Sequence, residues 1–189
     1  MNSSEVPYLG QGNTPPYSRS ERIRRAAWAL VQATLFRWSP RPCHGFRARL
    51  LRFFGAQVPA PDTVKIFPSA RVVFPWKLSL APHAMVGPRV WLYNLAPIEI
   101  GFGANVSQDC HLCSGSHDYR RWSMPLVTRA IVIERNVWLC AEVFVAPGVT
   151  IGELAVVGAR SVVRGNLPAR QVCAGDPCVP VKPRAEPQP

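Results

Sequence analysis

From Ile66 to Val163 an aliphatic side chain returns at intervals of six residues, with two extra residues after Val72 and after Leu92. The fifteen positions all hold Ile, Leu or Val, and they are Ile66, Val72, Leu80, Val86, Leu92, Ile100, Val106, Leu112, Val127, Ile133, Leu139, Val145, Ile151, Val157 and Val163. A period of six does not match an α-helical turn and is too short for a pair of helices. It fits a short strand followed by a corner, wound as a parallel β-helix. Three hexads make one triangular coil, so the sequence predicts an all-β fold of about five coils.

The repeat has one long interruption, in which nine extra residues separate the hexad of Leu112 from Val127. The interruption begins in the stretch S-G-S-H-D, which contains His117. We expect residues 118–126 to leave the β-helix as an excursion loop with His117 at its root.

The segments on either side of the repeat follow other patterns. Ser20 with Glu21 in the first turn predicts the start of a helix, and one face of this helix is marked by Ile23, Ala27, Leu30, Val31, Thr34 and Leu35. A second helical pattern consists of Phe46, Leu50, Phe53 and Phe54 and ends at Gly55. We predict a flexible N-terminus (1–19), a basic helical cap (20–55) over the open edge of the first coil, a β-helix (66–167), and a C-terminal arm and tail (168–189).

Charge is unevenly distributed along the chain. The formal net charge is +11, and residues 1–52 hold nine arginines against two glutamates. We expect the arginines of the cap, including Arg22, Arg24, Arg25, Arg37, Arg47, Arg49 and Arg52, to face an anionic membrane surface rather than nucleic acid. A solvated charged face is the alternative. The longest apolar run, residues 26–36, is too short to span a bilayer, and the N-terminus lacks the pattern of a secretory signal, so the sequence favours a cytoplasmic location.

The six cysteines favour reduced thiols over a metal site. Cys110 and Cys113 have the spacing of a zinc knuckle, but no second pair with a similar gap follows. We therefore expect no bound metal.

Several short motifs lie along the repeat and its flanks: RPCHGFRARLLRFFGA, FPWKL, VWLYN, SQDCHLCSGSHD, LVTRAIVI, NVWL, APGVTIG, VVGARSVV and AGDPCVPVKPR. Together they resemble the hexapeptide-repeat acyltransferases, and among these the O-acetyltransferases of the colanic acid biosynthesis branch. The resemblance covers about residues 20 to 184. It implies a left-handed parallel β-helix and transfer of an acetyl group from acetyl-CoA to a sugar hydroxyl of a polysaccharide or glycolipid precursor. It also implies a homotrimer whose sites lie between subunits.

The resemblance assigns roles to individual residues. His117 stands where the family has its catalytic base, and direct transfer without an acyl-enzyme is expected because the chain has no G-x-S-x-G elbow. Asn94 and Asp109 are implied to contact the acceptor, although asparagine also suits a corner turn. The residues implied to hold coenzyme A are Trp138, Ala141, Ala159, Arg160, Arg164, Lys182 and Arg184.

Two other classes of function remain open from the sequence. A zinc protein like the gamma-class carbonic anhydrases would use several histidines, but His111 and His117 are one hexad apart and so point from adjacent faces of the coil. A non-catalytic β-helix scaffold that docks on a membrane or a partner is the second alternative. Failure to bind acetyl-CoA would favour the scaffold, and zinc content would identify the carbonic anhydrase class.

Overall fold

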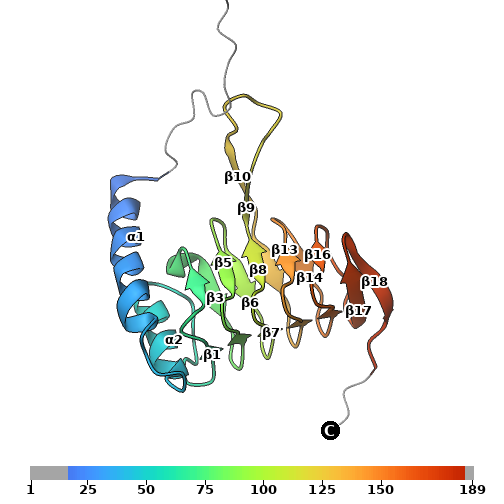
Figure 1. The fold of residues 1–189 in the computed structure, drawn as a ribbon, viewed down its shortest axis with the longest axis horizontal. Coiled ribbons are helices and arrows are strands. Elements are labelled where there is room, and N and C mark those ends of the chain that lie inside the picture. Colours follow the sequence, from blue (N-terminus) through green and yellow to red (C-terminus); the bar gives the residue numbers. More distant parts are fainter. Residues whose placement is uncertain (1–16, 186–189) are drawn as a thin grey trace, which may run out of the picture.

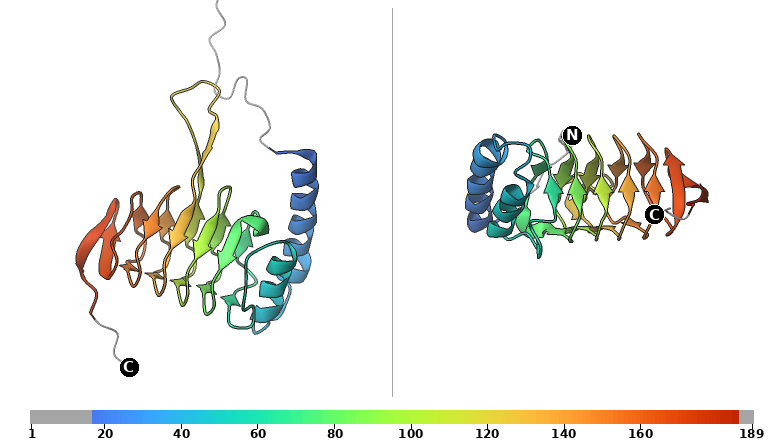
Figure 2. Two further views of the ribbon diagram at one scale, coloured as in Figure 1. Left: turned by 180° about the vertical axis from the view of Figure 1, so that it is seen from behind. Right: turned by 90° about the horizontal axis from the view of Figure 1, so that it is seen from below.

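The computed structural model describes residues 17–185, and these fold as a parallel β-helix closed at one end by helices (Figure 1). Face 1 contains β1 (Lys65–Ile66), β4 (Met85–Val86), β7 (Asn105–Val106), β12 (Trp138–Leu139), β15 (Val156–Val157) and β17 (Gln171–Gly175). Face 2 contains β2 (Arg71–Val72), β5 (Trp91–Tyr93), β8 (His111–Cys113), β13 (Phe144–Val145) and β16 (Val162–Val163). Face 3 contains β3 (Leu78–Leu80), β6 (Ile98–Ile100), β11 (Ile131–Ile133) and β14 (Thr150–Ile151). The chain visits the three faces in turn, and successive coils stack along one axis (Figure 2), which confirms the predicted β-helix of about five coils.

The aliphatic anchors form the interior of the coils. Fourteen of the fifteen predicted anchors are at most 1% exposed. Val127 is the exception at 37% exposed, so its assignment as an anchor was wrong. It lies in β10 (Leu126–Thr128), which pairs antiparallel with β9 (Gly115–His117) in a hairpin that projects from the edge between faces 2 and 3 (Figure 1). Val127 matched the six-residue spacing by chance, because β10 is a strand of this hairpin and not part of a coil.

Close stacking of the coils requires a residue without a side chain at some corners. A Cβ built on Gly101 would lie 2.7 Å from the carbonyl carbon of Glu134 in the next coil. Gly101 also donates its N–H to Ile133 O at 2.7 Å, which sets the distance between these coils. Glycine at this corner is therefore a packing requirement.

The helical cap satisfies the backbone of the first coil, as predicted. It consists of α1 (Arg19–Val31), a π-helical turn η1 (Gln32–Phe36) and α2 (His44–Phe53). Trp28 Nε1 donates to Val72 O at 2.6 Å, and Gln32 Oε1 accepts from Val72 N at 2.7 Å. These two side chains take the place of a preceding strand at β2.

The start of α1 and the side it buries differ from the prediction. Ser18, not Ser20, is the N-cap, and it forms a capping box with Glu21. The buried side of α1 is centred on Trp28, whereas Ile23 and Leu30 are exposed. Of the predicted face, Ile23, Leu30 and Leu35 are exposed, and Val31 packs against the core.

Arg47 of α2 is fully buried, which excludes it from the surface arginines predicted to meet a membrane. Its Nε donates to Ile66 O at 2.7 Å, and its Nη atoms donate to Ser39 Oγ, Pro40 O and Arg41 O. Burial lowers the pKa of this guanidinium from its usual value. Arg47 therefore holds α2 and the α1–α2 connection onto β1.

The opposite end of the β-helix is closed by a hairpin. β17 pairs parallel with β15, and β18 (Cys178–Pro183) pairs antiparallel with β17. Much of the predicted C-terminal arm therefore extends face 1 instead of leaving the last coil. The predicted flexible N-terminus lies almost entirely outside the described residues. A short 3₁₀ turn, η2 (Pro75–Lys77), leads into β3, and no helix within residues 17–185 has the length and hydropathy to cross a bilayer.

Candidate functional site

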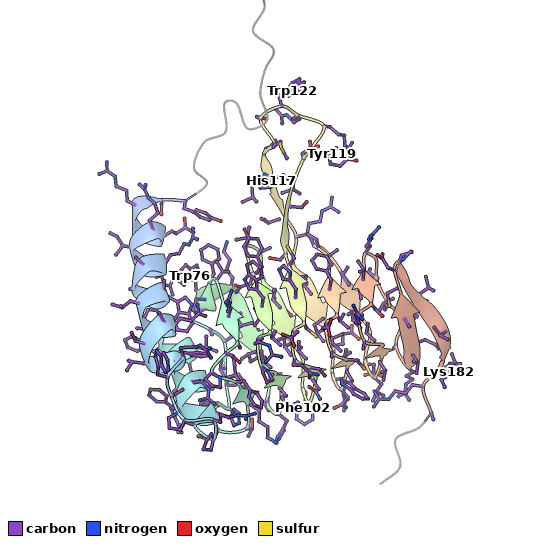
Figure 3. All side chains as sticks on the ribbon, viewed as in Figure 1. Trp76, Phe102, His117, Tyr119, Trp122 and Lys182 are labelled. Atoms are coloured by element: carbon purple, nitrogen blue, oxygen red, sulfur yellow. The ribbon has the colours of Figure 1, made fainter. Side chains whose placement is uncertain are left out.

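His117 lies at the end of β9, where the projecting hairpin begins its loop (Figure 3). Its Nδ1 is 2.6 Å from the carbonyl oxygen of Met124 on the returning side of that loop. A carbonyl oxygen only accepts hydrogen bonds, so Nδ1 carries the proton and Nε2 carries a lone pair in the neutral ring. The hairpin therefore fixes both the orientation and the tautomer of this imidazole.

A cavity of about 380 Å³ along the hairpin is lined in part by His117. Its lining includes Tyr119 and Arg120 from the loop, Arg129 from just beyond β10, and Pro147 from the next coil. Arg129 packs over the corner at Gly148, where an added Cβ would lie 3.0 Å from the Arg129 Cδ. Sequence reasoning did not identify Arg129, because its place beside His117 depends on the register of the hairpin, which pairs Thr128 with Gly115.

Asn94 is part of the coil corner in this structure. Its side chain is fully buried, and its Oδ1 accepts from the N–H groups of Val73 and Phe74. Its Nδ2 donates to the carbonyl oxygens of Phe74 and Lys77. The amide has no surface left for an acceptor sugar, so the geometry favours the corner-turn role over the predicted acceptor contact.

Asp109 lies on the edge between faces 1 and 2, away from the hairpin. Its carboxylate is held in two contacts by Arg89 of the preceding coil, at 2.6 and 2.7 Å. The hydrogen bond from Arg89 lowers the pKa of Asp109 below its usual value. The structure does not bring Asp109 together with His117.

Two of the seven residues implied to bind coenzyme A, Trp138 and Lys182, lie on face 1. Trp138 is half exposed on β12 and donates from Nε1 to Ser107 Oγ at 3.0 Å. Ala141 and Ala159 follow at the adjoining edge, where Ala141 O accepts from the N–H of Arg160 at 2.9 Å. Ala159 is exposed at this edge, and Ala141 is partly buried.

Lys182 joins the same face through strand register. Trp138 pairs with Val156, Val156 with Val172, and Val172 with Lys182, so the four outward side chains form one column. Three strand spacings separate Trp138 from Lys182, or about 14 Å. On the other side of Trp138 the column continues to Asn105, whose buried Oδ1 finds no hydrogen-bond partner within residues 17–185.

Arg164 and Arg184 lie elsewhere. Arg164 forms an ion pair with Asp176 at 3.0 Å. Arg184 Nη1 donates to the carbonyl oxygens of Asn136 and Leu154 on the edge between faces 3 and 1. Arg184 therefore closes a corner, and neither arginine shares the column of Trp138 and Lys182.

His117 and the Trp138 column are on opposite sides of one chain. The hairpin leaves from the edge between faces 2 and 3, and in a three-sided prism that edge lies opposite face 1. Figure 3 shows His117 on the projecting hairpin and Lys182 near the far end of the coils. One copy of the chain does not bring these two halves of the predicted site together.

The remaining histidine and cysteine candidates have structural surroundings. His111 stacks on Trp91 with ring centroids 4.5 Å apart, and burial lowers the pKa of its imidazole. All six cysteines are free thiols, and burial raises the pKa of Cys110 to about 11. Within the described part of the chain, no three His, Cys, Asp or Glu side chains are grouped so as to hold a metal ion.

Comparison with known proteins gives consistent matches. The family described as bacterial transferase hexapeptide (six repeats) matches residues 130–165. A protein of Escherichia coli named as a colanic acid biosynthesis acetyltransferase is 47% identical over 164 residues, covering 87% of this chain and 89% of that protein. A galactoside O-acetyltransferase of Lactococcus lactis is 41% identical over 78 residues, covering 41% of this chain and 37% of that protein.

Solved structures share the fold. A maltose O-acetyltransferase from Clostridium difficile superposes with a TM-score of 0.77 at 23% identity, covering 89% of this chain and 90% of that chain. A hexapeptide-repeat acetyltransferase from Vibrio cholerae, complexed with acetyl coenzyme A, has a TM-score of 0.77 at 24% identity and covers 94% of this chain and 96% of that chain.

Proposed function

The chain belongs to the hexapeptide-repeat acetyltransferases and is an acetyl-CoA-dependent enzyme, and from this we propose that it acetylates a sugar hydroxyl of a polysaccharide or glycolipid precursor. The observation that carries the proposed chemistry is the contact between His117 Nδ1 and Met124 O. It leaves Nε2 as an acceptor on a side chain that lines the cavity of about 380 Å³. The acceptor class rests on the relatives, which are named for colanic acid biosynthesis and for galactoside acetylation.

His117 would act as the general base in a direct transfer. Its Nε2 takes the proton of the sugar hydroxyl as that oxygen bonds to the acyl carbon, and it returns the proton to the sulfur as the carbon–sulfur bond breaks. Met124 O stabilises the positive ring that exists between these events, because Nδ1–H continues to donate to it. The guanidinium of Arg129 lines the same cavity and would stabilise negative charge that develops on the acyl oxygen.

The Trp138 column suits the donor. When bound, acetyl-CoA supplies an activated acyl group, an extended arm with two amides, and phosphates. Trp138 offers a flat apolar surface, and the turns at Ala141 and Ala159 offer backbone groups. Lys182, about 14 Å away in the same column, supplies positive charge for a phosphate.

A complete site on this scheme requires two copies of the chain. Because His117 and the Trp138 column face opposite directions, the hairpin of one copy must approach face 1 of another. Such a contact joins two different surfaces, the hairpin of one copy and face 1 of the next. In a closed ring every hairpin meets a face 1, so neither surface is left without a partner. We propose a homotrimer with three sites between subunits. A cytoplasmic location, where acetyl-CoA is available, stays a prediction.

The test compares the same substitution at two histidines. Release of coenzyme A thiol is measured from acetyl-CoA with a panel of nucleotide sugars and lipid-linked glycans. We expect His117→Asn to lower turnover with the active acceptor about 10²–10⁴-fold, as for the loss of a general base. His83→Asn is the matched control, because His83 is exposed on another edge and asparagine tolerates its positive φ of 62°.

Three results would count against parts of the proposal. Near-normal turnover in His117→Asn would place the base elsewhere. A chain that binds no acetyl-CoA and releases no thiol with any acceptor would favour the scaffold alternative. Active monomers in light scattering would refute the shared site while leaving the base assignment intact.

A further inference from the structure

The outer side of the helical cap combines exposed apolar side chains with arginines, and we propose that it docks the protein on an anionic lipid bilayer. This inference concerns the cap alone and goes beyond the acetyl transfer proposed above. The cap stands at the end of the β-helix, with α1 outermost, so its outer side is not covered by the coils (Figure 1, Figure 2).

The argument starts with α1. Its inner side is fixed by Trp28 and by Gln32 of the following turn, both hydrogen-bonded to Val72. Ile23 and Leu30 are separated by seven residues, so they share the outer side, and they are 71% and 67% exposed. Arg19 and Arg22 are exposed in the first turns of the same helix. A stripe of large aliphatic side chains facing solvent, with arginines beside it, is typical of interfacial helices.

The rest of the cap adds exposed aromatic rings. Trp38, just after η1, and Phe53, at the end of α2, are each 83% exposed. α2 also bears a hollow of about 520 Å³ lined by Phe46, Arg49, Leu50, Arg52 and Phe53. Tryptophan and phenylalanine at this exposure add apolar area that water solvates poorly, and aromatic rings favour the boundary between headgroups and acyl chains.

The positive charge of the helical cap favours an anionic partner. Between Ser18 and Phe54 the chain holds nine arginines and one glutamate. Four of the arginines are engaged within the fold: Arg47 is buried, Arg24 donates to Phe54 O and lies over Trp76, Arg25 lies over Tyr17 and Phe74, and Arg41 lies over Phe67. Arg22, Arg37 and Arg52 are exposed on the cap. Arg49 is exposed as well, although it pairs with Asp62.

This charge argues against a second copy of the chain as the occupant. Two copies joined through the cap would bring two sets of arginines together with almost no acidic side chain between them. An anionic bilayer supplies negative charge to the arginines and an apolar layer to Ile23, Leu30, Trp38 and Phe53 at the same time. A single partner then contacts both the exposed arginines and the exposed apolar side chains of the cap.

The experiment measures sedimentation of the full chain with phosphatidylglycerol–phosphatidylethanolamine vesicles and with neutral phosphatidylcholine vesicles, at low and high salt. We expect binding only to the anionic vesicles, weakened by salt. The double variant Trp38→Ser, Phe53→Ser should bind about tenfold more weakly or worse, because it loses apolar area. Arg22→Gln and Arg52→Gln should each cost about fivefold at low salt.

Matched controls lie at the other end of the molecule and on another edge. Val181→Ser removes an exposed apolar side chain from β18, and Arg135→Gln removes an exposed arginine far from the cap. Neither should change vesicle binding, and all variants should keep the thiol-release activity of the parent with a water-soluble acceptor. Equal effects in cap and control variants, or no binding to anionic vesicles, would overturn the proposal. A change of oligomeric state in the cap variants, seen by light scattering without vesicle binding, would also overturn it in favour of contact between copies.

Discussion

Replacing Arg47 by methionine tests whether one buried guanidinium fastens the helical cap to the first coil. Arg47 is completely buried and donates to four oxygen atoms, which belong to Ile66, Ser39, Pro40 and Arg41, at 2.6–2.8 Å. Methionine keeps much of the aliphatic stem and removes every donor. The substitution therefore isolates the hydrogen bonds from the packing of the side chain.

The expected magnitude follows from which acceptors keep another partner. Ile66 O keeps His44 Nδ1 at 2.8 Å, and Pro40 O keeps the N–H of Cys43 at 3.0 Å. Arg41 O and Ser39 Oγ lose the only donor that they face within residues 17–185. A hydrogen bond to a charged group contributes at least about 1.5 kcal/mol net, so two losses lower the free energy of unfolding by about 3 kcal/mol. In a domain of this length the Tm should fall by about 6–12 °C.

Urea and thermal unfolding followed by far-UV circular dichroism measure the effect. Arg52→Met is the control, because Arg52 is exposed on the same helix and its loss should change stability by less than about 0.5 kcal/mol. The reasoning fails if the two variants are equally stable, since the buried guanidinium would then contribute no more than a solvated one.

Three further predictions concern the coils. Gly101→Ala should lower the free energy of unfolding by about 2 kcal/mol or more, because its Cβ would lie 2.7 Å from the Glu134 carbonyl carbon, whereas Gly165→Ala meets no atom within 4 Å and should be neutral in urea unfolding. Burial lowers the pKa of His111, so the unfolded chain takes up the proton first as the pH falls below about 6.5, and the free energy of unfolding decreases there. His111→Phe should reduce the decrease measured between about pH 7 and pH 5. An unchanged decrease would contradict this. The pKa of Cys110 is raised to about 11 by burial, so iodoacetamide at neutral pH should label it only after unfolding in urea, and rapid labelling of the native chain, seen by mass spectrometry, would contradict its burial.

The interior of the β-helix was predictable because its requirement is strict. Each anchor must be apolar and of similar size to stack on the anchors of the neighbouring coils, and fourteen of fifteen positions obeyed this rule. Val127 failed because the same spacing arises by chance in a hairpin strand. The sequence contains no signal that separates an inward position of a coil from a regular position in a two-stranded ribbon.

The cap was predictable in place and purpose but not in orientation. Apolar periodicity in α1 located Ile23 and Leu30 on one face, and burial was the natural expectation for that face. The coil beneath instead needed hydrogen-bonding side chains for the open edge of β2, and Trp28 and Gln32 supply them. The need to pair the open N–H and C=O groups of β2 decided which side of α1 faces the coil. The spacing of hydrophobic residues carries no information about this need.

The candidate site also contains features that the sequence alone does not predict. The column of Trp138 and Lys182 depends on the register of β15, β17 and β18, and the sequence does not reveal that the last strand reverses direction. For Asn94 the sequence left two roles open, because a polar residue at a corner suits both a sugar and its own backbone, and in the structure four backbone groups occupy its side chain.

Inward and outward positions of each coil have different roles, which explains how so regular a fold can carry a specific site. In a β-strand alternate side chains point to opposite sides, so the anchors occupy only inward positions and place no demand on the outward ones. Trp138 and Lys182 use outward positions of face 1, and His117 uses a hairpin inserted at a corner. Residues of the hairpin loop can therefore change without loss of core packing, while the contact between His117 and Met124 O must persist for Nε2 to stay an acceptor. On this reasoning, substitutions at Tyr119 and Arg120 should alter which acceptor is used, measured by thiol release across the sugar panel, while the stability of the β-helix stays unchanged.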